Sequence, residues 1–299
     1  MKIVPKEELI KLLNGEEVEI TVLIKDYTVG NTKNGGKYLN GSCESKGVIP
    51  FKVWSGGTLD EMLDKSYRGK VVDCKADINI YNGSFGLILK EIKESNVSPL
   101  ELAEKPYDSE AMWKRLNKVL KDNMSDVGYT TACKVLEEVE EPFKSEVAAV
   151  SFHDNVFGGL LAHCYKMCLV LVYSLKMYRN IGNSCDKDLL YFGVLLHDIG
   201  KIKEYSNGSR SEVYFGGHTA FGVEYVSSFK DQFLLQYGEE WYYRLISIIS
   251  QHHGEFGEAP RTKEALFIHY IDMFESKVQM LNQTLPIEDQ VYIDKFRII

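Results

Sequence analysis

The sequence contains no histidine in its first 152 residues, although seven follow between positions 153 and 269. This absence excludes an imidazole-based site from the first half of the chain. The six cysteines form no CxxC pair, so neither a zinc ribbon nor a disulfide framework is predicted. No run approaches the roughly 20 apolar residues of a membrane-spanning helix, and the N-terminus lacks the apolar core of a signal peptide. We therefore expect a cytoplasmic protein.

The composition is that of a globular protein, with 44% apolar and 26% charged residues, and the length of 299 residues favours two domains. The net charge of −8 is unevenly distributed. Residues 1–100 hold 14 Lys+Arg and 14 Asp+Glu of the totals of 35 and 43, which leaves 21 and 29 for the rest. This balance does not support tight, non-specific binding of duplex DNA. Any nucleic-acid contact must depend on a local patch, on stacking or on a metal.

Residues 17–94 have the pattern of β-strands. The strand-like stretches are 17–29, 31–45, 47–54, 70–81 and 84–94, with Asn-Gly turn signals inside the second and between the last two. A helix is expected at 58–67, between the third and fourth strands. Five strands with a helix in this position are typical of the OB-fold, a small Greek-key barrel.

After a segment with two prolines at 95–106, apolar residues recur with the helical period of 3.6. The expected helices are 109–123, 126–140, 155–179, 187–198, 217–236, 239–252 and 263–283. The predicted fold is a multidomain α+β protein, a five-stranded OB-fold barrel followed by an all-α bundle. The expected parts are 1–98 (the barrel domain, with a short N-terminal helix), 99–107 (a linker), 108–285 (the helical domain) and 286–299 (a tail that is either a strand or a docking segment).

The histidines and two aspartates lie where ligands of a common site would lie. Most are at the end of an expected helix or inside an apolar helical run, as in LLHDIGK, where His197 and Asp198 end the run 191–196. A single buried histidine is commonly a hydrogen-bonded core residue, but a whole set would need a separate partner for each member. Imidazole and carboxylate ligands suit manganese, iron, cobalt or zinc, and an aspartate can bridge two ions. The pattern predicts a metal site.

The histidine-containing blocks resemble a known family when they are taken in order. They are HDNVFGGLLAH (153–163), LLHDIGK (195–201), GH (217–218), HHGEFGEAPRTKEALFIHYID (252–272) and ESK (275–277). The order H…HD…H…HH…D is similar to the HD phosphohydrolase superfamily. Together with the expected OB-fold, whose segment VLIKDYTVGNTKNGGKYLNGSCES is also similar, the blocks resemble YhaM-type 3′→5′ exoribonucleases over nearly the whole chain.

This resemblance implies a metal-dependent enzyme that hydrolyses the phosphodiester bonds of single-stranded RNA from the 3′ end, with single-stranded DNA as a further substrate. It implies two divalent ions per site, manganese first, with cobalt, iron, nickel or magnesium as alternatives. The implied ligands are His163, His197, Asp198, His218, His252, His253 and Asp272. A homo-oligomer without membrane contact is also implied.

The expected catalytic residues are Asp198, Lys201 and His153. Asp198 is the candidate bridging ligand because it offers two oxygens, and the resemblance assigns Lys201 to a substrate phosphate. His153 is a candidate for protonating the leaving group, with a structural or substrate-orienting role as the alternative.

The barrel is expected to hold single-stranded nucleic acid by stacking and backbone charge. The candidates are Lys33, Lys37, Tyr38, Lys52, Trp54, Tyr81 and Phe85, with Phe51 as a further aromatic. About half of the aromatic rings would instead fill the barrel core. We expect Trp54 to be exposed because it alternates with Lys52.

Two other functions stay open. One is an HD phosphohydrolase of free or cyclic nucleotides, in which the barrel serves assembly or regulation. The other is a non-catalytic single-strand nucleic-acid-binding protein with a degenerate metal site. Hydrolysis of small nucleotides without shortening of oligomers would favour the first, and absence of bound metal would favour the second.

Overall fold

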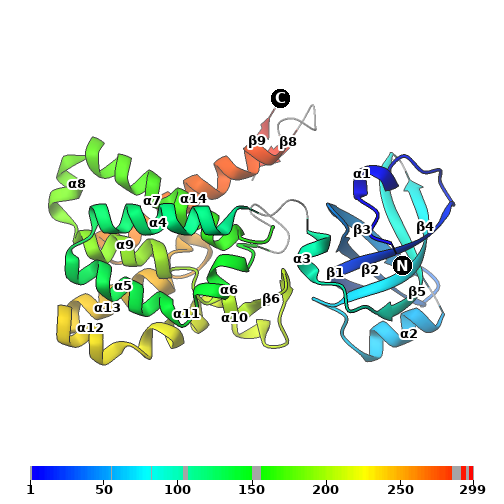
Figure 1. Ribbon diagram of the computed structural model, residues 1–299, viewed down its shortest axis with the longest axis horizontal. Coiled ribbons are helices and arrows are strands. Elements are labelled where there is room, and N and C mark those ends of the chain that lie inside the picture. Colours follow the sequence, from blue (N-terminus) through cyan, green and yellow to red (C-terminus); the bar gives the residue numbers. More distant parts are fainter. Residues whose placement is uncertain are drawn as a thin grey trace. The chain divides into compact units, whose positions relative to one another are not determined.

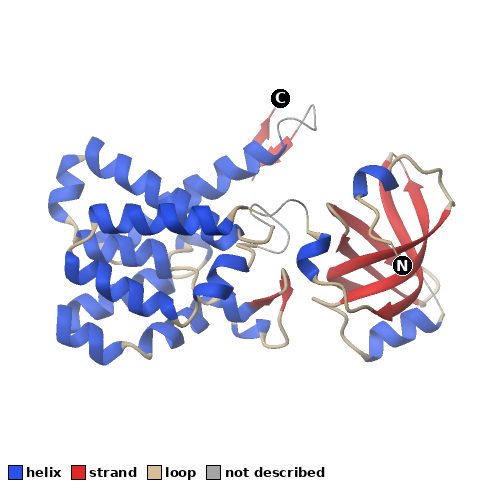
Figure 2. Cartoon of the chain, viewed as in Figure 1, coloured by secondary structure: helices blue, strands red, loops and turns tan. Residues whose placement is uncertain are grey.

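The computed structural model describes residues 2–54, 56–81, 83–103, 107–149, 156–284, 291–293 and 296–298. The chain divides into two compact units. One consists of Met1–Pro106 with Tyr205–Glu212, and the other of Tyr107–Glu204 with Val213–Ile299. The first unit is rich in strands and the second in helices (Figure 1, Figure 2). The predicted multidomain α+β fold is confirmed.

The first unit contains a closed five-stranded barrel. Its strands are β1 (Glu17–Asn31), β2 (Lys37–Glu44), β3 (Val48–Val53), β4 (Val71–Tyr81) and β5 (Ser84–Glu94). Their order around the barrel is β1-β2-β3-β5-β4. β3 and β5 pair in parallel, and the other four pairs are antiparallel. Helix α2 (Gly57–Asp64) lies between β3 and β4, so the strand order and the helix position are those of an OB-fold.

Alternation of side chains builds the barrel core. In β4, Val72, Cys74, Ala76 and Ile78 are buried while the residues between them are half-buried, as the period of two in a strand requires. β1 bends at an irregularity between Ile24 and Asp26, so its first half pairs with β4 and its second half with β2. This bend closes the barrel.

A short hairpin lies outside the expected strands. It consists of β6 (Tyr205–Ser206) and β7 (Ser209–Arg210), joined by Asn207 and Gly208, which both have positive φ. Asn-Gly pairs favour this two-residue turn, so the sequence contained a signal for it. The Ser209 hydroxyl donates to the carbonyl of Lys25 in β1. The chain therefore leaves the helical unit after Glu204 and returns at Val213.

The second unit is built mainly from helices. They are α4 (Ser109–Asn123), α5 (Asp126–Glu137), α6 (Glu140–Ser145), α7 (Gly159–Met177), α8 (Arg179–Ser184), α9 (Lys187–Leu196), α10 (Lys201–Glu204), α11 (His218–Ser227), α12 (Lys230–Tyr237), α13 (Glu239–Gln251) and α14 (Lys263–Thr284), with the 3₁₀ turns η1 (Tyr214–Gly216) and η2 (Gly254–Phe256). Beyond α14, β8 (Val291–Ile293) and β9 (Phe296–Ile298) form an antiparallel pair. The first unit adds the short helices α1 (Lys6–Leu9) and α3 (Pro99–Leu102).

Among the expected helices, one ends three residues early and another is divided into two. The helix expected at 126–140 ends at Glu137, because Pro142 removes a backbone donor and its ring clashes with the carbonyl four residues earlier. The helix expected at 217–236 is split into α11 and α12 at Ser228. There the Ser228 hydroxyl donates to the Tyr225 carbonyl at 2.6 Å, in competition with the backbone bonds that would continue the helix.

Helix α9 lies in the centre of the helical core. Every residue from Asp188 to Leu196 is buried, and the helix packs against α7, α13 and α14. Phe192 meets Phe233 and Trp241 edge-on, with centroids 5.4 and 5.6 Å away. This buried helix delivers the residues that follow its last turn into the interior of the unit.

Helix α7 also belongs to this core. Its 19 residues are long and apolar enough for a membrane span by length and composition alone, a test that core helices of globular domains also pass. Its N-terminal half is buried and includes Leu161, His163 and Cys164. The helix therefore packs its apolar side against the other helices of the unit and carries one of the candidate ligands inside.

Candidate metal centre

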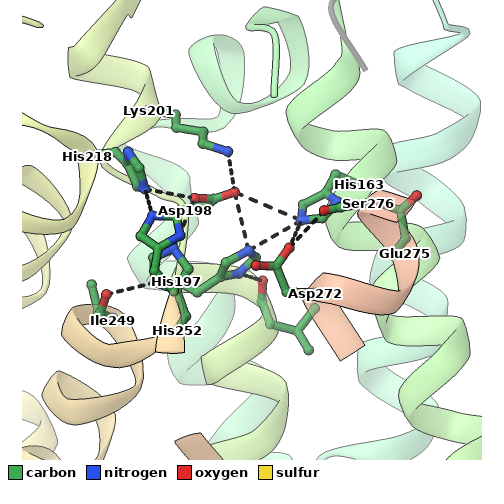
Figure 3. Close-up of polar contacts among 12 residues, drawn as sticks. His163, His197, Asp198, Lys201, His218, Ile249, His252, Asp272, Glu275 and Ser276 are labelled. Atoms are coloured by element: carbon green, nitrogen blue, oxygen red, sulfur yellow. Dashed lines mark hydrogen bonds and ion pairs between the residues drawn. The ribbon is translucent and has the colours of Figure 1, made fainter. Parts of the chain in front are cut away.

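The seven implied ligands converge in the helical unit, although they come from five separate places in the sequence. Figure 3 shows His163, His197, His218, His252 and Asp272 grouped around Asp198. The residues are His163 of α7, His197 and Asp198 after α9, His218 at the start of α11, His252 and His253 after α13, and Asp272 of α14. They form two groups.

The first group contains His163, His197 and Asp198, whose ligand atoms lie within 4.8 Å of one another. His163 Nε2 lies 3.3 Å from His197 Nε2 and 3.2 Å from Asp272 Oδ1. His197 Nε2 lies 3.3 Å from Asp198 Oδ2. Two imidazole nitrogens and two carboxylate oxygens therefore face one small volume.

The second group contains His218, His252 and His253, again with ligand atoms within 4.8 Å of one another. The Nε2 atoms of His218 and His253 are 2.8 Å apart. Asp198 Oδ1 lies 3.5 Å from His218 Nε2 and 3.6 Å from His252 Nε2. Asp198 thus presents one oxygen to each group.

Two buried acceptor atoms, one from each group, lack a hydrogen-bond donor in the described part of the chain. These atoms are Asp198 Oδ1 and His252 Nε2. His252 Nδ1 lies 2.8 Å from the carbonyl of Ile249 and must donate to it, so Nε2 carries the lone pair. Two acceptors then face each other at 3.6 Å. A cation satisfies both atoms. Leaving them unpaired costs about 1–3 kcal/mol for a neutral group and more for a charged one.

Carboxylates and carbonyls hold the far side of the rings. His163 Nδ1 lies 2.6 Å from Glu275 Oε2, and His218 Nδ1 lies 2.6 Å from Glu204 Oε2. His197 Nδ1 donates to the Val194 carbonyl at 3.0 Å. Such partners fix the orientation of an imidazole and leave its Nε2 lone pair for a metal.

Glu204 and Glu275 were not predicted as site residues. Glu275 stands in the ESK block, three residues after Asp272 on the same face of α14, and that spacing is a usable signal. Glu204 lies 14 residues before its partner His218, and the hairpin of the other unit separates them in the sequence. The sequence carries no local signal for that pair.

Buried charge sets the pKa values of the cluster. Burial raises the pKa of Asp198, but Lys201 and His197 outweigh it and hold this pKa well below its usual range. Burial likewise opposes ionisation of Asp272, yet the hydrogen bond from His163 and the charge of His197 lower its pKa. Burial also lowers the pKa of His163, whereas hydrogen bonds to Asp272 and Glu275 raise it to about 10. Carboxylates therefore flank both ring nitrogens of His163, with Asp272 at Nε2 and Glu275 at Nδ1.

Two other imidazoles, those of His252 and His253, favour the neutral form. Burial and the neighbouring His197 hold the pKa of His252 well below its usual range. Burial and His218 lower the pKa of His253. Neutral imidazole is the form that binds a metal. The arrangement of ionised carboxylates and neutral rings therefore fits divalent cations.

Lys201 lies at the edge of the cluster. Its Nζ is 2.6 Å from Asp198 Oδ2, and its side chain is 12% exposed. The ammonium group is thus paired with the shared carboxylate and is only slightly exposed.

The remaining histidines lie outside the cluster or outside the described residues. His153 is among the residues that the structure does not describe. His269 Nδ1 donates to the carbonyl of His252 at 2.6 Å, and Gly254 leaves room for the His269 ring. His269 therefore supports the backbone that carries His252, and Asp272 pairs with His163.

The nucleic-acid candidates all lie in the barrel unit. Trp54 follows β3 and is 43% exposed, which confirms the prediction that its side chain is exposed. Its ring stacks on Tyr38, with centroids 5.1 Å apart, and the Lys52 ammonium lies 5.2 Å from its centroid. Lys33 and Lys37 are exposed beside the turn between β1 and β2.

A hollow of about 320 Å³ lies on the same barrel, lined by Lys52, Tyr81 and Phe85 among others. Tyr81 is 70% exposed and Phe85 half-buried. Phe51 is only 1% exposed, so its proposed contact with nucleic acid is wrong. Alternate residues of β3 point inward, and Phe51 fills the barrel core with Ile49.

Comparison with known proteins gives one family match and several similar solved structures. Residues 161–277 match the HD domain, which belongs to the metal-dependent phosphohydrolase superfamily. Among solved structures, the mitochondrial single-stranded DNA binding protein Rim1 of S. cerevisiae in one crystal form is 20% identical over 27% of this chain and 95% of its own, with a TM-score of 0.25. A second form of Rim1 is 18% identical over 27% and 96%, with a TM-score of 0.23.

Replacement of Glu275 by glutamine should weaken Mn²⁺ binding by roughly 10–100-fold, because the amide orients the His163 ring without the negative charge. Titration calorimetry with Mn²⁺ measures the change. Glu224→Gln is the matched control, since Glu224 is exposed and pairs only with Lys203 among the described residues. Equal affinity in Glu275→Gln and wild type would show that Glu275 does not tune the site.

Replacement of Gly200 by alanine should disrupt the second group. A Cβ at this position would lie 1.9 Å from the His218 carbonyl oxygen and 2.6 Å from the Gly222 nitrogen, so α11 must move. We expect at least a tenfold loss of Mn²⁺ affinity, a magnitude typical of a misplaced ligand. Gly182→Ala is the control, because its nearest contact would be an ordinary 3.4 Å. Unchanged affinity in both variants would contradict the packing described here.

Proposed function

We propose that the protein is a metal-dependent 3′→5′ exoribonuclease that hydrolyses single-stranded RNA, with single-stranded DNA as a second substrate. One observation carries the proposal: two histidine groups share Asp198 in a chain that also contains an OB-type barrel with an exposed Trp54. The HD domain supports hydrolytic phosphate chemistry, and the barrel supports a single-stranded polymer as substrate. The 3′→5′ direction comes from the resemblance to YhaM-type enzymes.

The two groups fit two divalent cations. One ion would be held by His163, His197, Asp198 and Asp272, and the other by Asp198, His218, His252 and His253. Manganese is the proposed ion. Imidazole-rich sites also suit cobalt, iron or nickel, whereas magnesium prefers oxygen ligands. When bound, such ions activate a water for attack and stabilise charge on the phosphate oxygens.

The residues of the chain position these parts. Asp198 offers one oxygen to each group and so holds them in a fixed relation. Lys201 places a positive charge at the edge of the site, where it can contact a non-bridging phosphate oxygen. His153 is proposed to protonate the leaving oxygen or to orient the substrate. The chemistry requires no serine or cysteine nucleophile.

The barrel residues are proposed to hold the strand. Trp54 and Tyr81 are exposed aromatic side chains, and aromatic rings are groups on which bases stack. Lys33, Lys37 and Lys52 offer charges for the backbone. With a net charge of −8, the chain gains affinity from such local features and not from its overall charge.

The two other functions differ in the residues that they would need. A phosphohydrolase of free or cyclic nucleotides would use the same metal ligands but would not need the Tyr38–Trp54 stack with its exposed Trp54. A non-catalytic binding protein would not need the second histidine group, which is complete here. The combined presence of stack and ligands favours the exonuclease.

Incubation of the purified protein with 5′-labelled single-stranded RNA in Mn²⁺ should give a ladder of products shortened from the 3′ end. The ladder should disappear in Asp198→Ala, because that variant loses the carboxylate that faces both groups. Asp231→Ala, which removes an exposed aspartate of α12, should keep full activity. A parallel reaction with single-stranded DNA gives the ratio of the two substrates.

Absence of a ladder from a manganese-loaded wild type would contradict the exonuclease. Release of product from free or cyclic nucleotides in the same samples would then establish the phosphohydrolase. Strand binding without hydrolysis of any substrate would establish the binding protein.

Replacement of Trp54 by alanine should weaken binding of single-stranded RNA by roughly 5–150-fold, because one stacked base contributes about 1–3 kcal/mol. Fluorescence anisotropy of a labelled oligonucleotide, without metal, measures the dissociation constant. Tyr243→Ala, at a half-exposed tyrosine of α13, is the control and should bind like wild type. Equal binding by Trp54→Ala would remove this residue from the proposed interface.

A further inference from the structure

A hollow of about 500 Å³ lies in the helical unit, lined by residues from the end of α4, the second half of α7, the short helix α8 and the first half of α9. We name it the α8 hollow. Its lining includes three basic residues, Lys176, Arg179 and Lys187, and no acidic residue. All three are exposed, and none forms an ion pair with another described residue. The α8 hollow therefore gathers positive charge without counter-charge in a chain whose net charge is −8.

The carboxylates on either side of Lys187 in the sequence are bound to other groups. Asp186 accepts a hydrogen bond from the Leu189 backbone nitrogen at 2.9 Å and so caps α9. Asp188 is buried and accepts a hydrogen bond from the Ser125 backbone nitrogen, also at 2.9 Å. Like charges that line one hollow repel each other, and a bound anion removes this repulsion. The arrangement therefore favours an anionic ligand in the α8 hollow.

A buried tyrosine lines the α8 hollow as well. Tyr191 of α9 is 1% exposed, and its hydroxyl makes no hydrogen bond to another described residue. Burial raises the pKa of this hydroxyl, so it stays protonated and can donate a hydrogen bond. The large majority of buried polar side-chain atoms in native proteins have a partner. The hollow that Tyr191 lines is the place from which a ligand can supply one.

The size of the hollow and the rest of its lining indicate what kind of anion fits. Pockets for small organic ligands have volumes of roughly 300–1,000 Å³, so the α8 hollow holds far more than a phosphate ion. Asn123 and Asn183 supply amide groups, which combine donors and an acceptor as the edges of nucleobases do. Asn123 donates its Nδ2 to the Val119 carbonyl at 2.8 Å, which leaves its Oδ1 as an acceptor. Val172 and Leu175 add apolar surface for the face of a ring.

We propose that the α8 hollow binds a nucleoside phosphate, whose phosphate contacts the three basic side chains and whose nucleoside contacts the amide and apolar residues. A phosphate monoester carries a charge of about −1.5 to −2 at pH 7, which suits a group of three cations. Arg179 can donate two parallel hydrogen bonds to such a group. Tyr191 would donate to the ligand from the buried side of the hollow.

This site is separate from the metal centre, because none of the seven candidate metal ligands lines it. It is also separate from the nucleic-acid candidates, which lie in the barrel unit. The inference therefore does not depend on the proposed nuclease activity.

Titration calorimetry of the full chain with adenosine and uridine 5′-monophosphate tests the proposal. EDTA in the buffer prevents the phosphate from binding through an ion at Asp198. We expect wild type to bind with a dissociation constant of about 1 mM or lower. Arg179→Gln and Tyr191→Phe should each bind at least about tenfold more weakly, since a hydrogen bond to a charged group commonly contributes that ratio. Lys121→Gln, at an exposed lysine of α4 outside the lining, should bind like wild type.

Two further ligands and one barrel variant complete this experiment. Adenosine without phosphate and inorganic phosphate alone should each bind at least about tenfold more weakly than the nucleotide. Trp54→Ala should bind the nucleotide like wild type. The proposal would be overturned by a wild type that does not bind nucleotide, by equal affinity for inorganic phosphate, or by unchanged affinity in both Arg179→Gln and Tyr191→Phe. Loss of binding in Trp54→Ala alone would place the nucleotide on the barrel instead.

Thermal unfolding separates a lost ligand contact from a damaged fold. Without ligand, Tyr191→Phe should keep the Tm of wild type, because the deleted hydroxyl has no partner in the described part of the chain. Tyr242→Phe is the matched control, since Tyr242 is also buried but its hydroxyl lies 3.1 Å from Ser227 Oγ. We expect this control to have a lower Tm and to bind nucleotide like wild type. A lower Tm in Tyr191→Phe would assign its hydroxyl to the fold and contradict its role as a ligand group.

Discussion

The buried carboxylate of Asp198 is the constraint on which the helical unit depends. An ionised carboxylate in a protein interior costs several kcal/mol unless opposite charge surrounds it. Here one oxygen faces His197 and Lys201, and the other faces His218 and His252. Helices α9 and α13 therefore end close to Asp198, and helix α11 begins there. Residues that are far apart in the sequence therefore meet around this one charge.

Much of this arrangement could be predicted from the sequence. The position of a helix between the third and fourth strands indicated the OB-fold, because few small barrels have that order. His197 and Asp198, at the end of an apolar run, indicated a buried charge that needs partners. The confinement of histidine to positions 153–269 indicated that those partners are imidazoles of one domain.

Other features could not be predicted, because they depend on packing between distant residues. Glu204 holds His218 across a hairpin that belongs to the other unit, so no spacing in the sequence connects them. The inward direction of Phe51 follows from the register of β3, and composition does not determine a register. The apolar residues Leu266, Tyr270, Phe274 and Val278 of α14 would suit a core helix, and only the structure shows that they are exposed.

The most direct measurement is anomalous diffraction at the manganese edge from crystals of the full chain grown with Mn²⁺. We expect two peaks, one among His163, His197, Asp198 and Asp272 and one among Asp198, His218, His252 and His253, separated by about 3.5–4 Å as in two-metal hydrolases. Absence of anomalous density beside Asp198 at saturating Mn²⁺ would contradict the account of these residues as a metal centre.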